Sequence, residues 1–291
     1  MRRLSIRFGK RARGFTLVEA IIVMVLTAIL ASVMVLFIRR PVQSYIETSE
    51  RADMADVAEI ALRRMARELH GALPNSIRWM VVGNVSYLEF IPTKGGGIYL
   101  AAEDGADPAA HPPLSFTAAT AAFEVVGPMP AAPYAIAAND YIVVYNLGAG
   151  YTNADAYAGG NVAPVVSVNG QRVSITSTQF SNASPGKRFQ VAMTPVTFAC
   201  SNDAATGRGT LTRRWGYATK LPSSGAQTVP TGGYTALMAD NVYGCQFWTQ
   251  QAANQNTALV GLSIALARAN PDSGGLETVT LSQQIHVDNT P

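Results

Sequence analysis

Glu19 is the residue whose position most needs a chemical explanation, because it is the single charge in an apolar run from Phe15 to Phe37. An acidic side chain inside such a segment costs roughly 2.5–3.5 kcal/mol on membrane-insertion scales, so it usually marks a function. A buried carboxylate also needs a partner that neutralises it. The sequence therefore singles out Glu19 as a functional residue. The simpler alternative is a carboxylate that reaches back to the membrane surface.

Catalytic patterns elsewhere in the chain are incomplete. Gly261–Ala265 nearly matches the G-x-S-x-G nucleophile motif but lacks its second glycine, and Ser263 falls within a predicted strand. Gly95–Gly97 and Ser184–Lys187 lack the spacing of a phosphate-binding loop, so both are predicted to be turns. We therefore predict that the chain is not an enzyme, and we expect no small-molecule substrate.

Metal-ligating residues are few and scattered. The three histidines, His70, His111 and His286, show no metal-binding spacing. Four aspartates would bind calcium only if the fold gathered them: Asp104, Asp107, Asp140 and Asp155. We expect no metal and no cofactor.

The basic residues are concentrated at the start of the chain. Six of the 22 lysines and arginines lie in the first 14 residues, and the remainder has 16 basic and 19 acidic residues, a net charge of −3. Arg213, Arg214 and Trp215 suggest a basic aromatic patch for DNA, but neighbouring residues of a strand point to opposite faces. A net negative charge also weakens nonspecific DNA binding. We expect no nucleic-acid partner.

The apolar run is long enough to cross a membrane. As a helix its 23 residues span ~34 Å at 1.5 Å per residue, compared with ~30 Å for a bilayer core. Six basic residues precede it and two follow it, which favours a cytoplasmic N-terminus. A cleaved secretory signal is one interpretation, although the site near Ala31 is poor. A plain anchor is another, but it leaves Glu19 unexplained.

The junction before the apolar run supports a third interpretation. Lys10–Arg13 followed by Gly14-Phe15-Thr16-Leu17-Val18-Glu19 resembles the type IV prepilin signal. The resemblance implies that a prepilin peptidase cleaves between Gly14 and Phe15 and methylates the new amine of Phe15. Glycine suits this position, since it has no side chain to obstruct the protease. The apolar helix would remain in a filament core, where Glu19 would meet the Phe15 amine of a neighbour and set the assembly register.

The rest of the chain predicts an α+β fold, with one long N-terminal helix followed by a mainly antiparallel β head. An apolar stripe predicts a helix over residues 42–70 that lies against a sheet: Met54, Val57, Ala61, Met65 and Leu69. Pro41 is expected to kink the join with the apolar helix. Strands are predicted at residues 76–82, 85–91, 141–145, 164–168, 172–175, 188–193, 196–200, 209–215, 244–249, 259–267 and 277–287. The dipeptides Gly83-Asn84 and Asn169-Gly170 each predict a hairpin between the strands on either side.

Four segments are therefore predicted along the chain. Residues 1–14 form a cleaved leader, and residues 15–40 form the transmembrane and filament-core helix. Residues 41–72 form an amphipathic helix that continues into the head. Residues 73–291 form the antiparallel β-rich head.

Several head segments are similar to the MshO family, minor pilins of the MSHA type IV pilus that resemble J-type pseudopilins of type II secretion. They include Leu73–Arg78, Asp140–Asn146, Pro195–Cys200, Leu211–Tyr217 and Ile285–Pro291. The similarity implies a scarce subunit that primes or caps filament assembly. Its expected partners are other minor and major pilins, prepilin peptidase and the inner-membrane assembly platform.

Two alternatives remain for this function. One is a minor J-type pseudopilin of type II secretion, and the other is an adhesive or DNA-receptive module at a pilus tip. The expected location is the bacterial inner membrane with the head in the periplasm, followed by the pilus at the cell surface.

Cys200 and Cys245 are the two cysteines of the chain. Disulfides persist in the periplasm, so we expect these residues to form a structural disulfide there. In a cytosolic protein, two cysteines 45 positions apart would more commonly be unpaired core residues.

Overall fold

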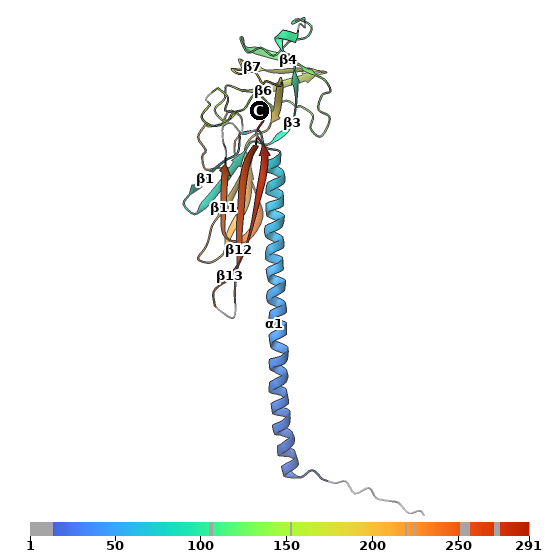
Figure 1. Cartoon of the computed structure of the whole chain (residues 1–291), viewed down its shortest axis with the longest axis vertical. Helices are drawn as coiled ribbons and strands as arrows, with labels where there is room; N and C mark the ends of the chain where they lie inside the picture. Colours follow the sequence, from blue (N-terminus) through green and yellow to red (C-terminus); the bar gives the residue numbers. More distant parts are fainter. Residues whose placement is uncertain are drawn as a thin grey trace, which may run out of the picture. The chain divides into compact units, whose positions relative to one another are not determined.

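The computed structural model describes residues 14–104, 107–151, 153–218, 220–223, 225–250, 257–270 and 274–290 (Figure 1). Residues 1–13 of the predicted leader, which ends at Gly14, lie outside this described part. The chain divides into two units, Met1–Asp53 and Met54–Pro291. One long helix followed by antiparallel strands confirms the predicted α+β class.

The helix α1 (Leu17–His70) is continuous, with Pro41 in its interior. The helix predicted over residues 42–70 is therefore a continuation of the apolar helix. In the first unit, every residue from Leu17 to Val35 is exposed except Ala20, which is half-buried. This segment has an apolar surface on all sides, as expected of a helix that is buried in lipid or against other helices.

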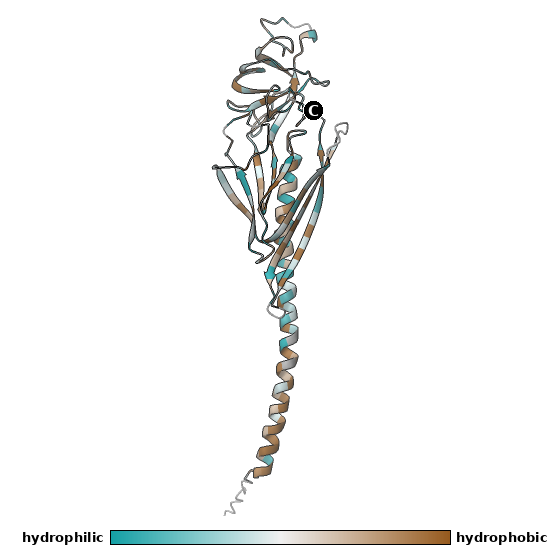
Figure 2. Cartoon of the chain, turned by 90° about the vertical axis from the view of Figure 1, so that its left-hand side faces the viewer, coloured by the Kyte–Doolittle hydropathy of each residue, from teal (hydrophilic) through white to brown (hydrophobic). Residues whose placement is uncertain are grey.

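In the second unit, one face of α1 is buried in the main core. The buried positions follow spacings of three and four residues: Ala58, Ala61, Leu62, Met65, Ala66 and Leu69. The inclusion of Val57 in this stripe was wrong, since Val57 is 39% exposed. The stripe passes from Met54 to Ala58, four residues later, so the neighbouring position 57 faces outward. Figure 1 and Figure 2 both show this part of α1 alongside the strands of the head.

A seven-stranded antiparallel sheet packs on this helix in the order β1-β2-β9-β10-β11-β12-β13. Its strands are β1 Arg78–Val82, β2 Val85–Phe90, β9 Val196–Ser201, β10 Gly209–Trp215, β11 Tyr234–Gln250, β12 Thr257–Ala269 and β13 Leu276–Asp288. The predicted inward face of β12 is confirmed, because Val260, Leu262, Ile264 and Leu266 are all buried.

Strand β11 is ten residues longer at its start than predicted, and it changes partner along its length. Its first part pairs with β10 as far as Val242, and its last part pairs with β12 from Val242 onward. A register shift follows Val242, and Asn241 has a φ of 53°. Such a bulge bends a strand, so one strand serves both halves of the sheet.

The other six strands close into a barrel in the order β3-β4-β7-β6-β5-β8. They are β3 Thr93–Tyr99, β4 Thr120–Val126, β5 Tyr141–Val143, β6 Val162–Asn169, β7 Arg172–Thr178 and β8 Arg188–Ala192, with a short 3₁₀ helix η1 at Ala102–Asp104. The barrel has its own core, which includes Phe123, Phe180 and Phe189. Strand β2 pairs directly with β9, so the barrel is an insertion between two neighbouring strands of the sheet.

The sequence patterns missed two strands of the barrel, β3 and β4. The predicted turn at Gly95–Gly97 was wrong, because these residues lie within β3. Packing against β8 explains two of the glycines. A Cβ on Gly96 would lie 2.5 Å from the Phe189 carbonyl oxygen, and one on Gly97 would lie 2.9 Å from the Phe189 ring. The predicted turn at Ser184–Lys187 is confirmed.

Asparagine side chains join the chain after β5 to the chain that follows α1. Asn146 Nδ2 donates to the Pro74 carbonyl oxygen at 2.6 Å, and Asn75 Nδ2 donates to the Asn146 carbonyl oxygen at 2.9 Å. The backbone N–H of Asn75 also donates to Asn289 Oδ1 at 3.1 Å. Asn289, just after β13, therefore contacts the chain that follows α1.

Candidate processing and assembly segment

The predicted cleavage and methylation residues lie just before α1. Phe15 is 75% exposed. No heavy atom lies within 4 Å of the point where a Cβ on Gly14 would sit. Within the described structure, the peptide bond between Gly14 and Phe15 is therefore not covered by side chains packed against Gly14.

Thr16 caps the N-terminus of α1. Its Oγ1 accepts a hydrogen bond from the Glu19 backbone N–H at 3.3 Å, and its carbonyl oxygen accepts one from the Ala20 N–H at 3.1 Å. Thr16 and Glu19 have the T-x-x-E spacing of a capping box. This cap was not among the roles predicted for Glu19, which were assembly and contact with the membrane surface, although the T-x-x-E spacing is visible in the sequence.

The Glu19 carboxylate lies on the exposed first turn of α1. A negative charge there is stabilised by the positive end of the helix dipole, typically by 0.3–1 kcal/mol at an exposed site. Among residues 14–290 that the structure describes, no cation pairs with this carboxylate. Glu19 is therefore an acid on an exposed apolar helix whose charge has no partner within the described chain.

The helix around Glu19 is suited to an apolar environment. It is long and apolar enough to cross a membrane, by length and composition. Its hydroxyl groups are satisfied locally, since Thr27 Oγ1 donates to the Val23 carbonyl oxygen at 2.8 Å and Ser32 Oγ to that of Ile29 at 2.7 Å. Internal hydrogen bonds of this kind remove the cost of a polar group in lipid. The segment is compatible with membrane anchoring.

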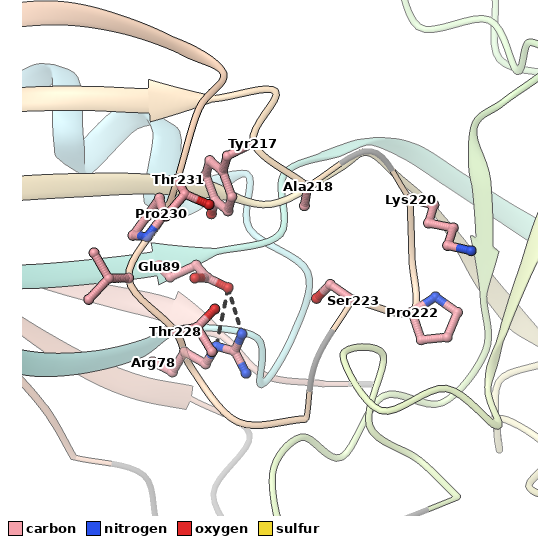
Figure 3. Close-up of a pocket in the computed structure, with 11 residues that line it drawn as sticks. Arg78, Glu89, Tyr217, Ala218, Lys220, Pro222, Ser223, Thr228, Pro230 and Thr231 are labelled. Atoms are coloured by element: carbon pink, nitrogen blue, oxygen red, sulfur yellow. Dashed lines mark hydrogen bonds and ion pairs between the residues drawn. The ribbon is translucent and has the colours of Figure 1, made fainter.

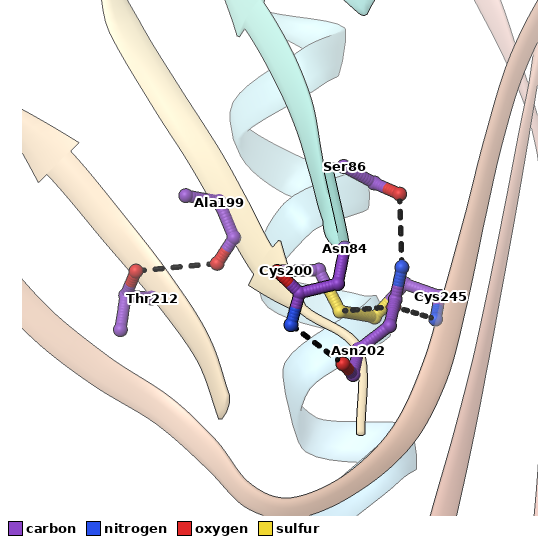
Figure 4. Close-up of a disulfide and its surroundings, with 7 residues drawn as sticks. All are labelled: Asn84, Ser86, Ala199, Cys200, Asn202, Thr212 and Cys245. Carbon is purple, nitrogen blue, oxygen red and sulfur yellow. Dashed lines mark hydrogen bonds between the residues drawn. A yellow bond between two sulfur atoms is a disulfide. The ribbon is translucent and has the colours of Figure 1, made fainter. Parts of the chain in front are cut away.

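Cys200 of β9 and Cys245 of β11 form the expected disulfide, with a Cα–Cα distance of 6.2 Å (Figure 4). Both cysteines are buried. Asn202 supports the bond, because its Oδ1 accepts from the Cys245 N–H at 2.7 Å and its Nδ2 donates to Ser86 Oγ at 3.3 Å. The disulfide joins β9 to the part of β11 that pairs with β12.

A buried ion pair on the head was not predicted. Arg78 of β1 lies opposite Glu89 of β2, with 2.7 Å between Arg78 Nη2 and Glu89 Oε1. Arg78 Nη1 also donates to the Gly225 carbonyl oxygen at 3.0 Å, and the guanidinium lies 3.5 Å from the centre of the Tyr157 ring. These contacts join Gly225 and Tyr157 to the edge of the sheet, where Arg78, Glu89 and Tyr217 line a cavity of about 320 Å³ (Figure 3).

Burial dominates the electrostatics of this cavity. It raises the pKa of Glu89 above its ordinary value of 4.5, although Arg78 opposes the shift. Burial also raises the pKa of Tyr217, with the Glu89 charge adding to the shift. Tyr217 therefore stays protonated and shares a hydrogen bond of 2.7 Å with Thr197 Oγ1. The predicted hairpin at Gly83-Asn84 would have placed Arg78 opposite Glu89, so this pairing could have been predicted from the sequence.

We expect the substitution Glu89→Gln to change how stability depends on pH. A raised pKa in the folded state means that protonated Glu89 stabilises the fold and that this contribution is lost as pH rises through the raised pKa. Relative to the Glu89→Gln variant, the wild-type protein should therefore lose stability as pH rises above about 4.5. Urea unfolding of both proteins over a pH series measures this difference. A constant difference at all pH values would contradict the shift.

Other charged candidates from the sequence have local partners. The distances are 2.6 Å for Lys187 Nζ to Asp104 Oδ1, 2.7 Å for Lys94 Nζ to Asp140 Oδ1, and 2.7 Å for His111 Nδ1 to Glu124 Oε2. Asp107 and Asp155 accept backbone N–H groups of their own turns. Within the described residues, no group of three or more His, Cys, Asp or Glu side chains could hold a metal ion.

The candidate nucleophile Ser263 and the candidate DNA-binding residues Arg213 and Arg214 have other contacts. Ser263 lies within β12, where its Oγ accepts from Ser282 Oγ at 2.9 Å. Arg213 and Arg214 point to opposite faces, as predicted. Arg213 Nε lies 2.7 Å from Glu68 Oε2, and Arg214 Nη1 donates to the Pro230 carbonyl oxygen at 3.0 Å.

Comparison with known families gives one match. Residues 9–35 match the prokaryotic N-terminal methylation motif. The matched range includes Gly14, Phe15 and Glu19 and most of the apolar part of α1. No curated protein and no solved structure shows significant similarity to the chain.

Proposed function

We propose that this chain, which its methylation motif supports as a type IV pilin-like protein, is a minor pilin of an MSHA-type pilus. The observation that carries the proposal is the position of the motif. Its Gly14–Phe15 junction lies in exposed chain directly before a helix with an apolar surface. A pilin motif implies association with other pilus components in general, and the finer assignment rests on the head segments similar to the MshO family.

In the proposed mechanism, prepilin peptidase cleaves after Gly14 and methylates the amine of Phe15. The new terminus lies one residue before the Thr16 cap. The apolar part of α1 then leaves the membrane and joins other pilin helices. Glu19 brings a carboxylate into that apolar contact, and the Phe15 amine of a neighbouring subunit neutralises it. A buried charge pair of this kind is costly when misaligned, so it selects one register.

The head would face the periplasm and then the cell surface. Its inserted barrel makes it larger than the seven-stranded sheet alone. We propose that it contacts other minor pilins at the end of the filament, where a scarce subunit primes assembly.

The substitution Gly14→Val is expected to block processing. A branched side chain at this position would obstruct the protease, because glycine leaves the backbone open. Mass spectrometry of the wild-type protein from its own cells should find an N-terminus at methylated Phe15, whereas the variant should retain the leader. The substitution Ala12→Val adds the same side chain two residues away and serves as the control. A wild-type chain that keeps its leader would overturn the proposal.

Deletion of the gene tests the assignment to a pilus. Electron microscopy of the deletion strain should show loss of surface filaments, and the restored gene should bring them back. Normal filaments together with the loss of a secreted protein would instead identify a type II secretion pseudopilin.

A further inference from the structure

Strand β13 forms a long edge of the seven-stranded sheet. It pairs with β12 at every residue from Leu276 to Asp288, without a register shift. No other strand in the described part of the chain pairs with it. Alternate N–H and C=O groups of β13 therefore point away from β12 and have no sheet partner. The opposite edge, β1, has only five residues.

Several features that protect edge strands are absent from β13. The strand contains no proline and no lysine, and its pairing with β12 has no bulge. Residues 278–285 carry no charge, and the flanking Glu277 is paired with Arg268. A long, regular edge with an uncharged centre can pair with another strand, and it promotes aggregation when it stays unpaired.

The side chains of β13 indicate what kind of strand would fit. On one face, Ile285 and Val287 are buried, while Val279 and Leu281 are only partly covered. The other face is exposed and bears Thr280, Ser282 and Gln284 among its polar residues. A strand that alternates apolar and uncharged polar residues would complete the cover of Val279 and Leu281 and continue the polar face.

We propose that β13 pairs with an edge strand from the head of another pilin-like subunit. This inference rests on the proposed function, since it takes the neighbours of the chain to be pilin-like. The partner strand recognises the free backbone groups of β13, and its alternating side chains set the register.

The direction of β13 excludes its symmetric pairing with a second copy. Strand β13 ends beside the chain that follows α1, where Asn289 Oδ1 accepts from the Asn75 N–H. Two β13 strands related by a twofold axis would run antiparallel, and the adjoining helices of the two heads would then point in opposite directions. Subunits anchored in one membrane point the same way. The partner therefore offers a different strand.

Photo-crosslinking in cells tests this pairing with the full-length chain. One variant carries a benzophenone amino acid in place of Thr280, on the exposed face of β13. The control variant carries it in place of Thr212 of β10, a strand that is paired on both sides. We expect the Thr280 probe to form an adduct with a strand of a second protein that carries its own methylation motif. No adduct above the Thr212 control, an adduct with β13 of a second copy, or one only with a protein lacking the motif would overturn the proposal.

A pair of proline variants tests whether the backbone edge is responsible. Of two adjacent residues in an edge strand, one N–H points to the paired strand and the other points outward, where proline is tolerated. The substitutions Gln283→Pro and Gln284→Pro are therefore compared. The variant that keeps the wild-type unfolding midpoint is the one in which proline replaces a residue whose N–H points away from β12. It should lose the Thr280 adduct. An unchanged adduct in that variant would contradict strand pairing.

Processing at Gly14 is measured in the same cells and separates the two proposals. A processed chain without the Thr280 adduct would contradict the pairing of β13 alone. A chain that keeps its leader would contradict the proposed function.

Discussion

The substitution Glu19→Val is expected to abolish filament assembly and to leave cleavage between Gly14 and Phe15 intact. The variant loses the carboxylate that would pair with a neighbour's amine, while the junction read by the peptidase is unchanged. Valine makes the helix easier to place in the membrane, by roughly 2.5–3.5 kcal/mol, so lost assembly would not reflect lost insertion. Filament counts by electron microscopy, with the mass of the mature chain, measure both effects.

Two further substitutions serve as controls for Glu19→Val. Glu47→Val removes an acid from the same helix beyond the apolar run and should leave filaments at their normal number. Glu19→Asp keeps the charge and should restore part of the assembly. Normal filaments in the Glu19→Val strain would refute an assembly role for this carboxylate and favour a side chain that only caps the helix with Thr16.

The double substitution Cys200→Ser and Cys245→Ser is expected to destabilise the head by about 4 kcal/mol, the value that chain entropy predicts for a loop of this length. The bond spans 45 residues. It also lies in the main core, where serine hydroxyls would need new partners. Urea unfolding of the full chain in detergent, followed by tryptophan fluorescence, measures the free energy of unfolding.

The wild-type protein under a reducing agent provides the comparison for this variant. It should show the same loss of stability, because both samples lack the disulfide. The substitution Ser201→Ala, next to Cys200, should change the free energy of unfolding by no more than about 0.5 kcal/mol. A loss below about 1 kcal/mol in the double variant would show that the disulfide does not hold the two parts of the sheet together.

Local patterns account for the elements that were predicted correctly. Gly83-Asn84 and Asn169-Gly170 predicted their hairpins, because short turns need residues that tolerate positive φ; Gly83 has a φ of 61° and Gly170 a φ of 58°. The alternation of larger apolar and smaller residues in β12 predicted its buried face, because neighbouring residues of a strand point to opposite faces. In α1, the same kind of pattern failed only at Val57, where the buried stripe takes its neighbour Ala58.

The strands β3 and β4 could not be predicted from local sequence patterns. Strand β3 contains three glycines and has no apolar alternation, and it is a strand because it pairs with β8, about 90 positions later. Strand β4 begins Thr-Ala-Ala and finds its place against β7. Pairings between distant segments depend on the whole chain, so neither strand is visible in a short window of sequence.

By itself, the sequence predicted the apolar helix and singled out the Gly14–Phe15 junction and Glu19, because these features depend on residues a few positions apart. The T-x-x-E spacing of the Thr16 cap is equally local, although the cap was found only in the structure. The sequence also restricted the disulfide to one pair, since the chain has two cysteines. Only the tertiary structure decided that a barrel is inserted between β2 and β9, that the Arg78–Glu89 pair lies beside Tyr157 and Gly225, and that β13 is an edge. These features arise from contacts between residues far apart in the chain, which no local spacing records.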